Sequence, residues 1–154
     1  MIVYLDSTFV IRRLLGVGKP AAFWGAWEKA YASTLMRTEC FRAADALRLN
    51  GDLDDDGRSR LGAWIETVCD TVAQVPVNEA VMRRAGEAFP VAVNTLQAIH
   101  LATMLELQAA HGVKCDIASA DESLVKAALS LGFARAEDPR PSAKGEGEAG
   151  TDGK

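Results

Sequence analysis

Short apolar runs alternate along the chain with longer segments of helical periodicity. Residues 2–5, 31–33, 72–77 and 113–119 are mostly apolar or β-branched and have the length of buried strands. Between them, residues 35–49 repeat apolar side chains at the spacing of one helix face. This alternation predicts an α/β protein of three layers, with helices on both faces of a mostly parallel central sheet.

Capping residues and glycines mark where the helices begin and end. Asn78, Asn94 and Asp121 each stand in front of a helical segment, and Gly16, Gly112 and Gly132 follow one. A helix after Pro20 would carry Trp24 and Trp27 on one face. We expect helices at residues 8–15, 21–31, 35–49, 58–71, 79–89, 95–110 and 121–131, and a last short strand at 133–135.

The length of 154 residues corresponds to one domain. An apolar fraction of 49% is sufficient for a core without disulfides or a structural metal. From residue 137 onward the sequence holds no large apolar residue, so it cannot bury enough surface to fold. We therefore predict a domain at 1–136 and a disordered tail at 137–154.

Net charge and hydropathy exclude several classes of protein. A net charge of −4 argues against a general nucleic-acid coat protein, although an enzyme can still bind RNA through a local basic surface. Asp6 interrupts the apolar start, and no apolar run approaches the roughly 20 residues that span a membrane. We expect a cytoplasmic protein. The three cysteines are far apart and odd in number, which predicts buried reduced thiols.

Carboxylates follow two of the predicted strands. Asp6 ends the first strand, and Asp121 lies just past the strand at 113–119. The carboxyl ends of parallel strands share one edge of a sheet, where ligands bind. Glu39 and Gln97 lie early in helices that can face the same crevice, and such oxygen donors favour Mg²⁺ or Mn²⁺. Each acid alone also has a structural explanation, as a helix cap or an exposed helix residue.

Four segments together resemble the PIN domain and, within it, the VapC-like toxin ribonucleases. The resemblance spans roughly residues 2–135 and is carried by 2–7 (IVYLDS), 33–39 (STLMRTE), 96–103 (LQAIHLAT) and 117–124 (IASADESL). It implies a three-layer α/β/α PIN-like domain and a metal-dependent endoribonuclease using Mg²⁺ or Mn²⁺. It also implies an RNA substrate, a homodimer and a small VapB-like antitoxin, for which apolar surface near Phe9, Phe23, Trp24 and Trp27 is a candidate contact.

The resemblance implies roles for individual residues. Asp6, Glu39 and Asp121 correspond to catalytic, metal-binding acids, and Ser7 and Ser119 to polar supports beside them. Near Asp6 and Glu39 in the sequence, four cations are candidates for RNA phosphate contacts: Arg12, Arg13, Arg37 and Arg42.

Gln97 departs from the family pattern, because it stands where the family has an aspartate. Its amide oxygen can face a cation, but the site loses one negative charge. Two hypotheses follow: a weakened endoribonuclease, or a catalytically degenerate PIN-like module that binds RNA or protein without cleaving. His100, on an apolar helix, is interpreted as a packed core histidine, and Asp116 is a weak candidate ligand. The aspartates at 52–56 lack the spacing of a calcium loop.

Overall fold

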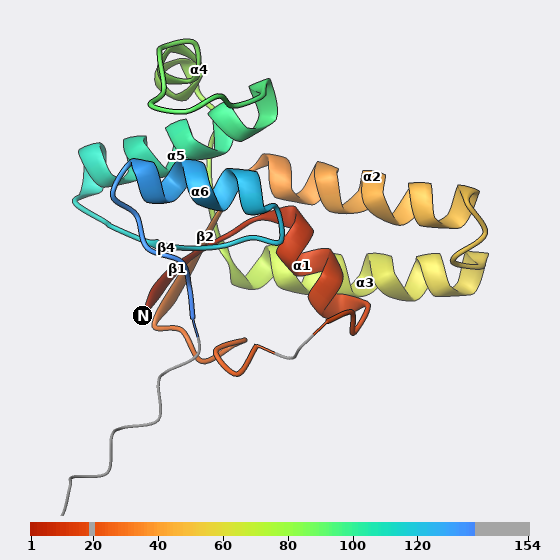
Figure 1. Cartoon of the computed structure of the whole chain (residues 1–154). Coiled ribbons are helices and arrows are strands. Elements are labelled where there is room, and N and C mark those ends of the chain that lie inside the picture. Colours follow the sequence, from red (N-terminus) through yellow and green to blue (C-terminus); the bar gives the residue numbers. More distant parts are fainter. Residues whose placement is uncertain (19–20, 138–154) are drawn as a thin grey trace, which may run out of the picture.

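A four-stranded parallel sheet lies at the centre of the protein in the computed structural model, which describes residues 1–18 and 21–137 (Figure 1). Within these residues the elements are β1 (Ile2–Leu5), α1 (Ser7–Leu14), β2 (Lys29–Ser33), α2 (Leu35–Leu49), α3 (Asp55–Thr71), β3 (Ala73–Val75), α4 (Glu79–Ala85), α5 (Thr95–His111), β4 (Asp116–Ala118) and α6 (Glu122–Ser130).

The strand order is β3-β2-β1-β4, so β1 is central. Tyr4 of β1 lies in register with Tyr31 of β2 and Ile117 of β4, and every pairing is parallel. Successive side chains of a strand point to opposite faces of a sheet. Val3 and Leu5 therefore enter one core, whereas Tyr4 enters the other.

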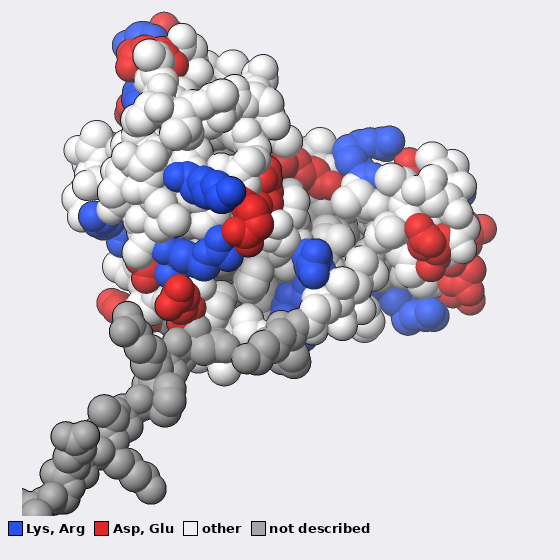
Figure 2. All heavy atoms as spheres, in the orientation of Figure 1, with Lys and Arg blue, Asp and Glu red and all other residues white. Residues whose placement is uncertain are grey.

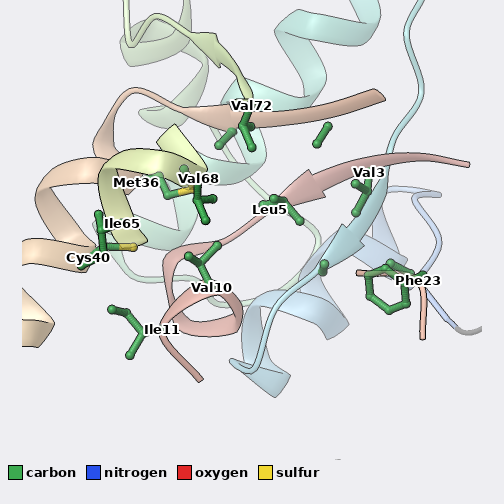
Figure 3. Packing of buried hydrophobic residues seen from close by; sticks show 14 of the residues in the cluster. Val3, Leu5, Val10, Ile11, Phe23, Met36, Cys40, Ile65, Val68 and Val72 are labelled. Carbon is green, nitrogen blue, oxygen red and sulfur yellow. The ribbon is translucent and has the colours of Figure 1, made fainter. Parts of the chain in front are cut away.

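Helices α1, α2 and α3 cover the first face of the sheet. Their apolar side chains pack on Val3 and Leu5, and Figure 3 shows this core from close by. Its helical members include Val10, Ile11, Met36, Cys40, Ile65 and Val68. Burying each such side chain contributes about 1.5–3 kcal/mol. This layer fixes the amino-terminal end of α1, and with it the residue that follows β1.

Helices α5 and α6 cover the opposite face, where Leu101, Met104, Leu124 and Val125 pack against Tyr4. Helix α4 packs on α5 and lies away from the sheet (Figure 1). Helices on both faces of a parallel sheet confirm the predicted three-layer α/β/α architecture.

One predicted helix is wrong. Residues 21–28 form turns rather than a helix, and Lys29–Ser33 form β2. Gly25 adopts a positive φ of 75°, which ends any regular helix there, and β2 gains the backbone hydrogen bonds of the parallel ladder with β1. Trp24 and Trp27 nevertheless contact each other, with ring centroids 5.3 Å apart. Pro20 lies outside the described residues.

Other boundaries shift by a few residues. Helix α4 ends at Ala85 rather than near residue 89, and the expected strand at 133–135 is reduced to one bridge between Ile117 and Arg135. Residues 138–154, which hold nearly all of the predicted tail, lie outside the described residues, so the domain boundary near 136 stays a prediction.

The cysteines are unpaired, as predicted, but only two of the three are buried, because Cys69 is partly exposed. Cys40, Cys69 and Cys115 are free thiols, and Cys40 and Cys115 are buried. Burial raises the pKa of the Cys40 thiol to about 12, and the nearby Cys69 and Glu39 act in the same direction. Cys40 is therefore a packing residue of the first core. None of the described helices has the length and apolar character needed to span a bilayer.

Candidate active site

The carboxyl ends of β1 and β4 bring two aspartates to one edge of the sheet. Leu5 pairs with Ala118, and the Asp6 N–H donates to the Ala118 carbonyl at 3.0 Å. The Ser119 hydroxyl joins the two chain segments, because it donates to Asp6 Oδ2 at 2.8 Å and accepts from the Asp121 N–H at 2.9 Å. Asp6 and Asp121 thus lie on the same side of the molecule, as the strand positions predict.

Asp6 is the N-cap of α1 and is almost fully buried, with 2% of its surface exposed. Its Oδ2 accepts hydrogen bonds from the Thr8 N–H at 3.2 Å, from the Thr8 hydroxyl and from Ser119. These donors satisfy the carboxylate on the side of the helix cap. Its second oxygen, Oδ1, lies on the side of Glu39 and His100.

Glu39 and His100 complete a cluster with Asp6, although they come from different helices. His100 Nε2 lies 3.3 Å from Glu39 Oε1, 3.2 Å from Glu39 Oε2 and 3.6 Å from Asp6 Oδ1. One ligand atom from each of the three residues lies within 4.8 Å of the others, a separation at which one metal ion can be shared. The cluster comes from the amino-terminal turns of α2, the end of β1 and the middle of α5.

His100 is buried, as expected of a core histidine, but the structure gives it a polar function that sequence reasoning missed. Its ring nitrogens contact Glu39 and the Tyr4 hydroxyl, the latter at 2.9 Å from Nδ1. A usable signal was present in the sequence. Residues three apart on a helix share a face, so a site that includes Gln97 also reaches His100.

The acids around His100 alter its protonation. Burial opposes the charged imidazolium, yet the hydrogen bond and charge of Glu39, followed by the charges of Asp6 and Asp121, raise the pKa of His100 above its ordinary value. Tyr4 is held as a neutral phenol, because burial and then the charges of Asp6 and Glu39 raise its pKa. The two acids therefore lie beside a histidine whose charged form they favour and near a tyrosine that is held neutral.

Gln97 does not offer its amide oxygen to the cluster. Oε1 accepts from the Asn94 N–H at 3.0 Å, which closes a capping box at the start of α5. The amide nitrogen instead donates to Asp121 Oδ2 at 2.8 Å and to the Ser123 hydroxyl at 2.5 Å. The expectation that the oxygen of Gln97 faces a cation therefore differs from the observed geometry, since the helix cap uses that oxygen.

Asp121 is the N-cap of α6 and accepts hydrogen bonds on both oxygens. Besides the Gln97 amide, it receives the Ser123 N–H at 2.9 Å, the Ser123 hydroxyl at 2.7 Å and the Leu124 N–H at 3.2 Å. Partial burial acts against ionisation, but these donors outweigh it and hold the pKa of Asp121 below its ordinary value. Asp121 is thus a carboxylate already stabilised by protein donors.

The predicted support Ser7 is buried at the start of α1. Together with Thr8, Ile11, Arg12, Ala43 and Ala120 it lines a shallow groove beside the cluster. A neighbouring hollow shares Arg12 and Ala120 and adds Arg13 and Phe9. The groove therefore reaches Thr8, a hydrogen-bond partner of Asp6, at one end and the cations of α1 at the other.

The other predicted cations are engaged elsewhere. Arg37 pairs with Glu66 and stacks over Phe41, with its guanidinium 5.0 Å from the ring centroid. Arg42 pairs with Asp45 at 3.2 Å. On the face of the molecule that Figure 2 displays, acidic and basic side chains are interspersed rather than gathered into one basic surface. A phosphate backbone would thus meet isolated cations, consistent with the negative net charge.

Two other acidic positions have structural explanations. Asp116 begins β4 opposite Val3, so it lies at the end of the strand remote from Asp121, and burial raises its pKa. Asp54 is the N-cap of α3 and accepts from the Gly57 N–H at 2.6 Å. Neither residue joins the cluster.

Comparison with known proteins agrees with this architecture. The structure superposes on that of Mycobacterium tuberculosis VapC20, described as a Sarcin-Ricin loop cleaving toxin, with a TM-score of 0.57 over 89% of this chain and 99% of the other. The protein has a PIN-like α/β/α fold, shared with this VapC20 structure. Sequence identity is only 13%, so the likeness concerns the fold. No protein-family model and no curated protein sequence matches the chain.

Of the three acids predicted from the sequence, two lie in one cluster and the third lies beside it. Asp6 and Glu39 meet at His100, whereas Asp121 is tied to Gln97 one strand away. The donor set at Asp6 and Glu39 suits a divalent cation, because Glu39 Oε2 is buried and makes no hydrogen bond to any of the described residues.

Proposed function

We propose that this protein is a metal-dependent endoribonuclease of the VapC type. The observation that carries the proposal is the convergence of Asp6, Glu39 and His100 at the carboxyl end of β1, within a PIN fold. Asp6 and Glu39 would hold the divalent cation, for which Mg²⁺ and Mn²⁺ are the candidates, and Asp121 would add negative charge from the next strand end. Such a cation activates water for attack on phosphorus and stabilises the developing charge.

The residues of this chain would position RNA along the groove beside the cluster. Arg12 borders both hollows, one of which Ser7 also lines, and it is exposed, so it is the best placed of the four predicted arginines for a phosphate contact. Arg13 stacks on Trp24 at 5.5 Å and is also exposed. Arg37 and Arg42 would have to exchange their carboxylate partners for phosphate, which makes them secondary candidates.

A toxin of this type would act with an antitoxin and as a homodimer. The aromatic residues first considered as contact surface pack largely on one another: the rings of Phe9 and Phe23 stack at 5.5 Å, and Phe23 is buried. Exposed apolar side chains are found instead on α4, after it and at the start of α5, at Met82, Val91 and Leu96, and the first two line one hollow. This second surface is the better candidate for a protein contact, because its apolar area is accessible.

A degenerate PIN-like module is the second candidate function. The observation that favours it is Gln97, whose amide donates to Asp121 where the family pattern has another carboxylate. Such a module would bind RNA or protein without cleaving it.

One comparison separates the two functions. Wild type and Asp6→Asn, each purified free of antitoxin and of contaminating ribonuclease, are incubated with RNA in Mn²⁺ and in Mg²⁺. Asparagine is also a good N-cap, so the variant keeps α1 capped while removing the charge. We expect cleavage by wild type and none by Asp6→Asn. Equal rates in both metals would favour the degenerate module.

A further inference from the structure

His100 presents one ring nitrogen to the two buried acids of the site. Nε2 is 3.2 Å from Glu39 Oε2 and 3.6 Å from Asp6 Oδ1, and the side chain of His100 is 2% exposed. The nitrogen therefore lies in the same small space as the two carboxylates. Two oxygens and one imidazole nitrogen, supplied by three separate elements, form a mixed donor set.

The second ring nitrogen of His100, Nδ1, is held by a hydrogen bond with Tyr4. Nδ1 lies 2.9 Å from the hydroxyl of Tyr4, which is fully buried in β1, and the two rings meet edge to face at 76°. Histidines that bind metals usually have their other nitrogen held by such a partner, which orients the ring and sets its tautomer. The Tyr4 hydroxyl can either donate to Nδ1 or accept from it, so it serves His100 with and without a ligand on Nε2.

Glu39 supplies an independent sign of a ligand. Its Oε2 is buried and makes no hydrogen bond within the described part of the chain, despite lying 3.2 Å from His100 Nε2. A buried carboxylate oxygen without a donor is costly unless a cation or water satisfies it. By contrast, both oxygens of Asp121 accept hydrogen bonds from Gln97, Ser123 or Leu124.

We propose that Asp6, Glu39 and His100 bind one first-row transition-metal ion, such as Mn²⁺ or Zn²⁺, and that Asp121 stays outside the ligand set. Imidazole is a ligand for transition metals, whereas Mg²⁺ selects oxygen donors. The inference rests on the proposed function only in placing the ion at the nuclease centre.

The second histidine of the chain is an internal control for metal binding, because the two histidines lie at different places on α5. His100 is in the cluster and His111 is exposed at the end of the helix. Full-length protein is labelled with ¹⁵N in the histidine rings and titrated with Zn²⁺, Mn²⁺ and Mg²⁺. We expect Zn²⁺ to shift the Nε2 resonance of His100, Mn²⁺ to broaden it, and Mg²⁺ to leave it nearly unchanged. His111 should respond to none of them.

A pair of tyrosine variants tests the second contact of the ring. Tyr4→Phe removes the hydroxyl at Nδ1, whereas Tyr31→Phe makes the same change at the paired position of β2. Calorimetric titration with Mn²⁺ should show an affinity about 10–100-fold lower for Tyr4→Phe and unchanged for Tyr31→Phe. Thermal unfolding of each variant shows that the fold is retained.

The outcomes separate this inference from the proposed function. A His100 signal that stays unchanged in Zn²⁺ and Mn²⁺, or that moves no more than His111, would overturn the ligand assignment even if RNA were cleaved. A shifted His100 signal without RNA cleavage by the same sample would uphold the metal site and reject the nuclease. Equal Mn²⁺ affinities for the two tyrosine variants would also count against the assignment.

Discussion

The carboxyl ends of β1 and β4 have similar local structure but different chemical environments. Each strand is followed by an aspartate that caps the next helix, Asp6 for α1 and Asp121 for α6. Asp6 faces Glu39 and His100, whereas Asp121 faces the amide of Gln97. The two local sequences thus share one feature, a strand followed by an aspartate that caps a helix. The side chains packed against each aspartate decide whether it joins a candidate metal site or a hydrogen-bond network with neighbouring protein groups.

The sharpest way to break this comparison is to remove the same charge from each end. Asp6→Asn and Asp121→Asn both keep a good N-cap. We expect Asp6→Asn to lower RNA cleavage by about 10²-fold or more, since charge stabilisation through a metal is worth several kcal/mol. Asp121→Asn should lose much less. Single-turnover rates and Mn²⁺ titrations of both variants provide the measurement, and equal losses would show that the two ends act as one site.

Placing a second carboxylate beside Asp121 should give the β4 end a pair of acids, as the β1 end has in Asp6 and Glu39. Gln97→Asp replaces the donor to Asp121 with a second carboxylate, and Gln97→Asn is the neutral control of the same size. We expect Gln97→Asp to be less stable than the control without metal, by about 1–4 kcal/mol, because like charges repel.

Added Mn²⁺ should reverse that loss, bind more tightly than to wild type and raise RNA cleavage. Thermal unfolding with and without Mn²⁺, together with calorimetry, tests this. If Mn²⁺ stabilises the aspartate and asparagine variants equally, Gln97 does not limit metal binding.

The hydrogen bond from Gln97 should also be visible in the titration of Asp121. The pKa of Asp121 is held below its ordinary value, so its stabilising effect is present above the pKa of the unfolded chain and is lost as pH falls through the folded pKa. Gln97→Ala should raise the pKa of Asp121, as followed by ¹³C carboxyl NMR. The stability difference from wild type should shrink in acid. An unchanged Asp121 titration would contradict the proposed role of the amide.

The smallest effect is expected from surface cations. Arg12 borders the groove at the β1 end, whereas Arg135 pairs with Glu122 near the β4 end. Arg12→Ala should raise the KM for RNA and weaken its salt dependence by about one phosphate contact, and Arg135→Ala should change KM little. Neither should alter stability by more than about 1 kcal/mol. Salt-dependent KM measurements would contradict the assignment if Arg135→Ala had the larger effect.

Much of this arrangement was predictable because it depends on local chemistry. Helix α2 has the predicted bounds, and Asn78, Asn94 and Asp121 cap the predicted helices, since caps act within a few residues. The predicted helix at 21–31 was wrong because the structure of this segment depends on a distant partner. Its apolar spacing suits a helix, but β2 is formed by pairing with β1, a partner remote in sequence.

The sequence alone determined the alternation of strands and helices, the carboxylates at two strand ends and the departure at Gln97. Tertiary structure decided which of these acids meet. His100 and Glu39 are 61 residues apart, and Tyr4 and His100 are 96 apart, so no local pattern relates them. The amide orientation of Gln97 likewise depends on Asn94 on one side and Asp121 on the other. A side chain's chemistry is fixed by its type, but its partners are fixed by packing.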